Sequence, residues 1–315
     1  MLEIVSDIKL QRPLILAAIQ IQAALDHYAS AAAFEQKVSS ILSQVADKAG
    51  KNTDVLVVFP EDFGLGLVLT EDYPAITSCQ TLTEAGRRML IRHAPSVTRI
   101  AYRYKIPIVR AILSDRSKFV RHTYADVFPK LAKKYGFYIM AGSAPIPEGK
   151  CLFNQGYLFG PNGNLELTAR KVQLVPLEEE MGLNLCRGQA DALKCAHLPI
   201  GVVGIAICLD AFHEDIIASL AAQNVQILLQ PSFNPLPWTK QQEKDWKTGL
   251  WQAVQRHKGI IGVNPMMVGG LLDVIGEGLS SIVIHKDLSS DGSGYLARAN
   301  CPTDEEILMV KLVPK

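Results

Sequence analysis

The sequence has little of what marks several classes of protein. Its net charge is only +1, so the chain as a whole lacks the charge excess with which proteins bind nucleic acid. No stretch reaches the roughly 18 uninterrupted apolar residues of a membrane-spanning helix. The sequence contains no internal repeat and no low-complexity segment. We therefore expect a soluble globular protein that binds no nucleic acid.

Paired cysteines are missing as well. The cysteines of this 315-residue chain are scattered, with no CxxC pair and no metal-ligand spacing, which does not indicate a disulfide framework. His213-Glu214 has no second ligand pair at a suitable spacing, so we expect no metal. Reduced thiols indicate a cytoplasmic location. The six cysteines are Cys79, Cys151, Cys186, Cys195, Cys208 and Cys301.

The N-terminal segment PLILAAIQIQAAL follows Lys9 and Arg12 and superficially resembles a signal peptide. Gln20 and Gln22 interrupt its apolar run, however. We therefore interpret it as the first strand of the core.

Strand-like and helical segments alternate along the rest of the chain. Hydrophobic residues make up 48% of the sequence, which is enough for a well-filled core. This order predicts a layered α/β fold in which helices cover the sheets. The expected strands are 14–22, 54–62, 137–145, 153–166 (two strands joined by the PNGN turn), 201–209, 225–232, 259–265 and 280–285, and the expected helices are 30–50, 214–223 and 240–257.

Three reactive side chains follow apolar or strand-like segments: Glu61, Lys171 and Cys208. A thiol has a pKa near 8.5 and needs a base to become a nucleophile, which a carboxylate can supply. An ammonium can stabilise the oxyanion that forms when the thiol attacks a carbonyl. Taken singly, each residue has a simpler interpretation: a core thiol, a surface lysine and a helix-capping glutamate.

The segments around these residues resemble the three signature blocks of the nitrilase superfamily, the carbon–nitrogen hydrolases. The blocks are VLVVFPEDFG around Glu61, LTARKVQLVPLEEE around Lys171 and GVVGIAICLDAFHED around Cys208, and they occur in the family's order. AAIQ, AGSAP, FNQG, LLQPS and GLSSI are similar to the family as well. The resemblance extends from about Leu14 to about Ile284.

The resemblance implies a four-layer αββα sandwich, a single domain over residues 1–315 and no cofactor. It assigns Glu61 as the general base, Lys171 as the oxyanion-stabilising lysine and Cys208 as the nucleophile. The backbone N–H of Leu209 becomes the second oxyanion donor, and Phe233 a substrate-binding residue. Family members often carry a second glutamate after the lysine, for which Glu179 is the best match, with Glu178 and Glu180 as close rivals.

The activity that the resemblance implies is hydrolysis of a small-molecule amide through an acyl-enzyme on Cys208, in a homo-oligomer (a dimer or larger). Leu209-Asp210 follows the cysteine, whereas nitrilases proper tend to have Trp-Glu and many amidases Tyr-Asp, which favours an amide or carbamoyl substrate over a nitrile. The family's Arg-Ala-Glu-Asn stretch is replaced by AVQRHKG. Carbamoyl hydrolysis, nitrile hydrolysis and N-acyl transfer stay open as alternatives. A non-catalytic scaffold is the alternative from another class.

A basic segment is the main departure from the family's length. Residues 85–135 hold thirteen lysines and arginines against two aspartates, within an apparent insertion at about 71–135. This composition predicts contact with an anionic membrane surface or an acidic partner at Arg87–Arg121, or a lid over the site. The simpler interpretation is a solvated helix face that pairs with acidic residues elsewhere in the protein.

The three tryptophans also allow two interpretations. Trp238, Trp246 and Trp251 could line a substrate pocket. Alternatively, Trp246, Leu250 and Val254 are spaced as one face of a helix packed on the core.

Overall fold

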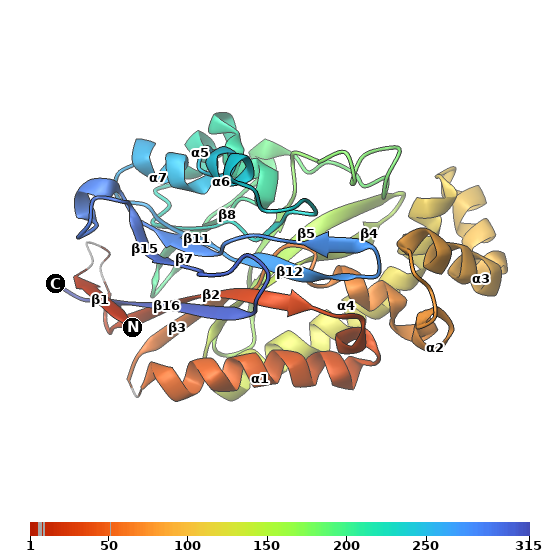
Figure 1. Ribbon diagram of the computed structural model, residues 1–315, viewed down its shortest axis with the longest axis horizontal. Coiled ribbons are helices and arrows are strands. Elements are labelled where there is room, and N and C mark those ends of the chain that lie inside the picture. The colour runs from red at the N-terminus through yellow and green to blue at the C-terminus, as the bar shows by residue number, and fades with distance from the viewer. Residues whose placement is uncertain (6–7, 9, 51) are drawn as a thin grey trace.

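The computed structural model describes residues 1–5, 8, 10–50 and 52–315. Two β-sheets pack face to face, and helices cover the outer side of each sheet (Figure 1). Helices α1 and α4 lie below the first sheet in this view, and α5, α6 and α7 lie above the second. The four layers confirm the αββα sandwich expected for the family.

The first sheet is organised around β2. This strand pairs with β3 in parallel and with β16 antiparallel, and its last residues pair with β12. The first strand expected from the sequence is therefore confirmed as a core strand. In sheet order the strands are β1 (Leu2–Val5), β16 (Glu306–Val313), β2 (Leu14–Ala23), β3 (Asp54–Val58), β4 (Tyr138–Glu148), β5 (Cys151–Phe159) and β6 (Leu165–Arg170), with β12 (Met266–Leu271), β10 (Ser232–Phe233) and β13 (Val274–Gly276) attached through β12.

The second sheet is shorter. Its central strands β8, β9 and β11 are parallel, as expected for strands that helices connect and cover. In sheet order the strands are β15 (Tyr295–Arg298), β14 (Ser281–Val283), β11 (Ile261–Asn264), β9 (Ile227–Leu229), β8 (Gly201–Ile205) and β7 (Ala196–Leu198).

Two hydrophobic cores follow from the alternation of side chains along the strands. Ile15 and Ile19 of β2 belong to the core under helices α1 and α4. Leu14 and Leu16 of the same strand belong to the core between the two sheets, which also contains residues of α5 and α7. A strand buried on both faces needs apolar residues at nearly every position, and of the ten residues of β2 only Gln22 is exposed.

Helices α2, α3 and α4 were not among the three helices expected from the sequence, and one of those three is interrupted. The segment predicted as one helix over 240–257 is two helices, α6 and α7, separated at Gly249. A Cβ atom at Gly249 would lie 2.9 Å from the ring of Phe212, so only glycine allows this close approach. Leu250 and Val254 are buried as predicted, and Trp246 packs against the same core. The helices are α1 (Ala31–Ala49), α2 (Tyr73–Ile76), α3 (Leu82–Tyr104), α4 (Ile108–Tyr135), α5 (Glu214–Ala221), α6 (Lys240–Trp246) and α7 (Leu250–Arg256).

Residues 71–135, the predicted insertion, fold mainly as α2, α3 and α4, and α3 lies at one end of the molecule (Figure 1). Helix α3 is kinked at His93, two residues before Pro95, which cannot donate the backbone hydrogen bond that a straight helix requires. The buried carboxylate of Asp72 pairs with the guanidinium of Arg92 (2.8 Å) and contacts Nε2 of His93 (2.9 Å) at this kink. This contact ties the hairpin of α3 and α4 to the short 3₁₀ helix η2 (Leu65–Asp72).

No helix among the described residues combines the length and the apolar character needed to cross a membrane.

Candidate active site

Lys171 is the centre of a buried cluster of charged side chains. It follows the last residue of β6 directly, and its side chain is 1% exposed. Its Nζ atom lies 2.7 Å from Oε1 of Glu61 and 2.5 Å from Oε2 of Glu178. Burial lowers the pKa of Lys171, but the carboxylate of Glu61, the thiol of Cys208 and the carboxylate of Glu178 together raise it well above its usual value. The side chain is therefore a permanent ammonium.

Glu61 lies three residues after β3 and is held by three donors. Its Oε2 accepts a hydrogen bond from the backbone N–H of Phe233 (3.0 Å), and its Oε1 accepts one from Nδ2 of Asn154 (3.0 Å) as well as contacting Lys171. Burial raises the pKa of Glu61, Lys171 opposes this effect, and Glu178 adds to it. A carboxylate of raised pKa that contacts a thiol is suited to accept and return a proton.

Gly142 on β4 explains how the chain before Glu61 reaches this position. A Cβ atom at residue 142 would lie 2.1 Å from the carbonyl oxygen of Pro60, and the residue has φ +70°. Both observations require glycine. The neighbouring Ser143 accepts a hydrogen bond from the backbone N–H of Asp62 (3.0 Å). The AGSAP segment thus holds the turn that carries Glu61.

Cys208 lies on a tight turn and not at the end of a strand. Strand β8 ends at Ile205, so the predicted strand 201–209 is too long, and Cys208 begins the 3₁₀ helix η4 (Cys208–Phe212). Its φ of 48° is unusual for a residue other than glycine. The backbone is held on both sides: its N–H donates to the carbonyl of Pro231 (2.9 Å), and its carbonyl accepts from Nε2 of Gln230 (2.9 Å).

The thiol of Cys208 is buried and hydrogen-bonded. Its side chain hydrogen-bonds the Glu61 carboxylate, and its Sγ atom lies 3.8 Å from the carbonyl oxygen of Phe233. Burial and the charge of Glu61 raise the pKa of Cys208 well above its usual value, against the effect of Lys171. The resting residue is therefore a neutral thiol beside the carboxylate of Glu61.

The second glutamate beside Lys171 is Glu178 and not Glu179, which was the best match from the sequence. Glu179 is half exposed and pairs with Arg187 at 2.6 Å on the surface. The chain turns at 175–178, where the N–H of Glu178 bonds the carbonyl of Val175 (2.8 Å) and the N–H of Val175 bonds Oε2 of Glu178 (3.0 Å). This turn directs the side chain of Glu178 back toward Lys171. Because Glu178, Glu179 and Glu180 are adjacent, the sequence alone does not indicate which of them contacts Lys171.

Two residues that contact the cluster, Asn154 and Asp210, were not among the candidate residues predicted from the sequence. Asn154, in FNQG, donates from Nδ2 to both Glu61 (3.0 Å) and Glu178 (2.8 Å) and so fixes the two carboxylates relative to each other. Asp210, two residues after Cys208, accepts hydrogen bonds from the backbone N–H groups of Val172 and Gln173. Burial raises the pKa of Asp210 to about 7, against the effect of these two donors. The sequence pattern that could have identified both residues is a polar side chain within an otherwise apolar segment.

Phe233 and Leu209 have different surroundings. The main chain of Phe233 contacts both Glu61 and Cys208, and its side chain is buried. Leu209 is half-buried.

The other predicted pockets and ligands lie outside the cluster. Glu214, considered as a metal ligand, pairs with Arg256 (2.6 Å) and His257 (3.0 Å). Trp238, Trp246 and Trp251 all line one small cavity of about 30 Å³.

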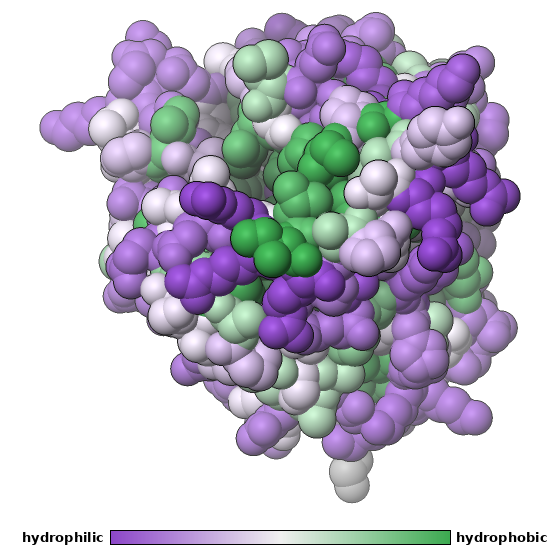
Figure 2. Space-filling view, turned by 90° about the vertical axis from the view of Figure 1, so that its right-hand side faces the viewer, coloured by the Kyte–Doolittle hydropathy of each residue, from purple (hydrophilic) through white to green (hydrophobic). Residues whose placement is uncertain are grey.

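An apolar pocket of about 120 Å³ lies where α3 and α4 meet η2 and the end of β12, and none of Glu61, Lys171 and Cys208 lines it. Leu65 and Leu183, on two of its walls, lie four residues after Glu61 and five after Glu178. Leu271 of β12 adds a third wall, and β12 also pairs with Phe233. Figure 2 shows the face of the molecule at this end, where hydrophobic side chains gather and polar ones surround them.

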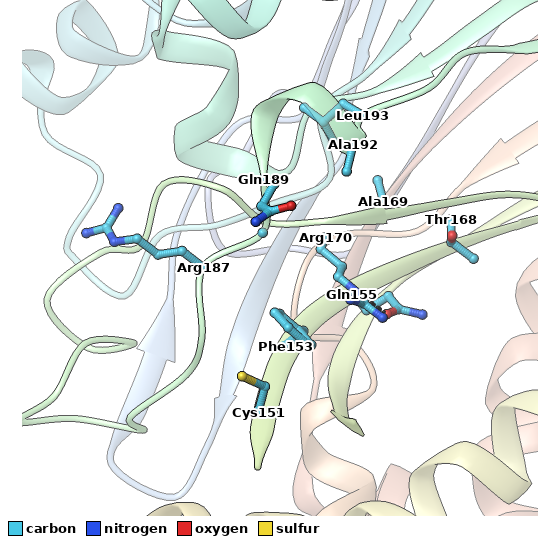
Figure 3. Close-up of a pocket in the computed structure, with 11 residues that line it drawn as sticks. Cys151, Phe153, Gln155, Thr168, Ala169, Arg170, Arg187, Gln189, Ala192 and Leu193 are labelled. Atoms are coloured by element: carbon cyan, nitrogen blue, oxygen red, sulfur yellow. Dashed lines mark hydrogen bonds between the residues drawn. The ribbon is translucent and has the colours of Figure 1, made fainter. Parts of the chain in front are cut away.

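A second cavity, of about 510 Å³, lies beside β5 and β6 (Figure 3). Arg170 and Gln155 lie side by side in this view, whereas Arg187 points away from them. Arg170 pairs with Glu148 and Arg187 with Glu179. The cations of this cavity already have acidic partners, and none of Glu61, Lys171 or Cys208 lines it.

Solved structures of similar fold cover nearly the whole chain. Nit3 of Saccharomyces cerevisiae, a member of branch 10 of the nitrilase superfamily, aligns with a TM-score of 0.64 and 18% identity over 99% of this chain and 93% of its own. A mutant of the amidase from Nesterenkonia sp. AN1 aligns with a TM-score of 0.66 and 16% identity over 98% and 93%. In that amidase, the acetamide moiety of fluoroacetamide is bound covalently at the active-site cysteine.

Curated sequences match over shorter stretches. The omega-amidase NIT2 of Danio rerio is 30% identical over 35% of this chain and 41% of its own length. The omega-amidase NIT2 of Mus musculus is 26% identical over 50% and 57%. The chain thus matches about two fifths to three fifths of the length of these relatives.

The family model for carbon–nitrogen hydrolases matches residues 15–283, a stretch that contains Glu61, Lys171, Glu178 and Cys208. Because this match extends over most of the chain, the protein belongs to the carbon–nitrogen hydrolase family, the nitrilase superfamily.

Proposed function

We propose that this protein hydrolyses the C–N bond of a non-peptide amide through a covalent acyl-enzyme on Cys208. The observation that carries the proposal is the buried contact of the Lys171 ammonium with Glu61, whose carboxylate also hydrogen-bonds the Cys208 thiol. The amidases among its relatives and structural neighbours support an amide as the substrate.

The first half of the reaction forms the acyl-enzyme. Sγ of Cys208 attacks the carbonyl carbon while its proton moves to Glu61, and the carbonyl electrons pass to the oxygen. The ammonium of Lys171 and the backbone N–H of Leu209 stabilise this oxyanion. When the intermediate collapses, the C–N bond breaks and Glu61 gives its proton to the departing amine. Because the thiol is neutral at rest, the proton transfer accompanies the attack.

The second half releases the acid. Water attacks the thioester, Glu61 takes its proton, and Sγ of Cys208 leaves and is reprotonated. Glu178 and Asn154 position the two reacting charges, since Asn154 donates to both carboxylates and Glu178 contacts Lys171. Carbamoyl or nitrile hydrolysis and N-acyl transfer would use the same side chains. Transfer differs only in that an amine replaces water in this half.

The apolar pocket supports a substrate with a hydrophobic part. Apart from the backbone, its walls are almost entirely hydrocarbon, from Leu65, Met89, Ile112, Leu183 and Leu271 among others. We infer that it receives the acyl chain. The helices α3 and α4 that enclose it belong to the segment that we regard as an insertion into the family fold.

The first prediction tests the reactive residues. With a panel of primary amides, Cys208→Ala should abolish ammonia release, because no other group can carry the acyl intermediate. Lys171→Ala should lower kcat/KM by about 10²–10³-fold, which is the typical effect of losing one oxyanion donor. Cys186→Ala, the control, removes a thiol outside the cluster and should retain the activity. Full activity of Cys208→Ala, with its fold verified by circular dichroism, would refute the proposal.

The second prediction concerns the pH profile. Glu61 must be ionised to act as a base, and its pKa is raised, so kcat/KM should fall with decreasing pH at a pH above the ordinary glutamate value of 4.5. Asn154→Ala removes a donor that favours the charged carboxylate, which raises the pKa of Glu61 further. The acid limb should therefore move to higher pH. Asn164→Ala, on the exposed turn after β5, should leave it unchanged. An acid limb that stays fixed or moves to lower pH in Asn154→Ala contradicts this role.

The third prediction tests the acyl pocket. No atom lies within 4 Å of a Cβ built on Gly86, which lines the pocket from α3, so Gly86→Leu adds hydrocarbon at the pocket without a clash at Cβ. KM for long-chain amides should then rise about tenfold, the equivalent of excluding about two methylene groups from apolar burial. KM for acetamide should not change. Gly86→Ala is the matched control, and an equal effect on both substrates would exclude the pocket from acyl binding.

A further inference from the structure

A third cavity, of about 570 Å³, lies between the second half of α3 and α4. Four basic side chains line it and define what we call the basic cleft. Arg99 and Arg103 come from α3, and Lys118 and Arg121 come from α4. All four are exposed. None of the proposed reacting residues lines this cavity, so it is separate from the candidate active site.

The charges of the basic cleft lack acidic partners. Among the described residues, Arg99, Arg103 and Lys118 form no ion pair, and Arg121 donates to the backbone carbonyl of Pro147. Asp115 also lines the cleft, but its carboxylate is only 5% exposed. It accepts hydrogen bonds from Ser96 (3.2 Å) and Arg116. Arg116 of the same helix therefore neutralises the charge of Asp115, which is not an acidic partner for the four cations of the cleft.

Some other cations of the same two helices are paired, although Arg87 and Lys133 form no ion pair within the described part of the chain either. Arg92 binds Asp72, Arg116 binds Glu71 and Lys130 binds Glu35. The simpler interpretation of the basic segment, a helix face that pairs with acidic residues elsewhere in the chain, therefore accounts for these residues. It does not account for the basic cleft.

The spacing of the four basic residues along their helices brings like charges close together. Arg99 and Arg103 are an i, i+4 pair on α3, and Lys118 and Arg121 are an i, i+3 pair on α4, so each pair sets like charges side by side. Across the cavity the two pairs share one space. Solvent screens part of the repulsion between these exposed charges, and the concentrated positive charge suits an anion with more than one negative charge.

We propose that the basic cleft binds a phosphate-bearing molecule. Three of its four cations are arginines, whose planar guanidinium matches phosphate oxygens with two parallel hydrogen bonds. The half-buried side chains of Ile100 and Tyr104 supply an apolar wall for the organic part of such a ligand. The phosphate belongs to a soluble metabolite or to a lipid headgroup, and both sources present the same chemistry to the cleft.

The test uses the full chain and inorganic pyrophosphate as the probe, with binding measured by isothermal titration calorimetry. The double variant R103Q/K118Q should weaken binding by about tenfold or more, because each lost charged hydrogen bond is worth more than a tenfold factor in affinity. The matched control R87Q/K133Q removes the same charge from exposed positions of the same helices outside the cleft. It should bind as the wild type does. Thermal melting verifies that both variants fold.

A parallel arm measures co-sedimentation with phosphatidylcholine vesicles that contain phosphatidate. Pyrophosphate binding that depends on the cleft supports a soluble ligand, and cleft-dependent sedimentation without pyrophosphate binding supports a headgroup. If neither probe binds, or if the control variant weakens binding as much as R103Q/K118Q, the proposal is wrong. Neither result bears on amide hydrolysis, because the four variant positions lie outside the candidate active site.

Discussion

The buried contact of one ammonium with two carboxylates is the constraint on which the rest of the site depends. Lys171 is almost fully buried between Glu61 and Glu178. Removing one partner from such a cluster leaves a buried charge without compensation, which typically destabilises a protein by about 3–5 kcal/mol. The two carboxylates outnumber the ammonium, and this excess of negative charge opposes ionisation of the neighbouring thiol. Burial raises the pKa of Cys208 most, and the negative charge of the same cluster adds to this effect, so the thiol is protonated at rest.

Both sheets are needed to bring these groups together. Glu61 and Lys171 follow strands β3 and β6 of the first sheet, and Cys208 follows β8 of the second. Asp210 connects the two, because it lies on the turn of Cys208 and binds the backbone just after Lys171. The main chain of Phe233 adds a second connection, since it contacts both Glu61 and Cys208. The sandwich thus supplies the geometry, and short polar contacts fix it.

The sequence predicted the layers and the cluster that contains Glu61, Lys171 and Cys208 because these depend on local patterns. Apolar runs such as the one in β2 indicate buried strands, and the ordered blocks around Glu61, Lys171 and Cys208 indicated the family. The choice between Glu178 and Glu179 depends on a turn at 175–178 that no local pattern specifies. The break at Gly249 depends on the ring of Phe212, which is distant in sequence. The oligomeric state and the single-domain organisation stay predictions.

The most direct measurement for the central claim is mass-spectrometric mapping of the chain after reaction with a sub-stoichiometric amount of 2-fluoroacetamide. This reagent has the shape of an amide and reacts slowly with ordinary thiols. The proposed mechanism predicts that the acetamide moiety is found on Cys208 and not on the other five cysteines, because only this thiol lies beside both Glu61 and Lys171. Labelling spread over the other five cysteines, with Cys208 reacting no faster than they do, would contradict it.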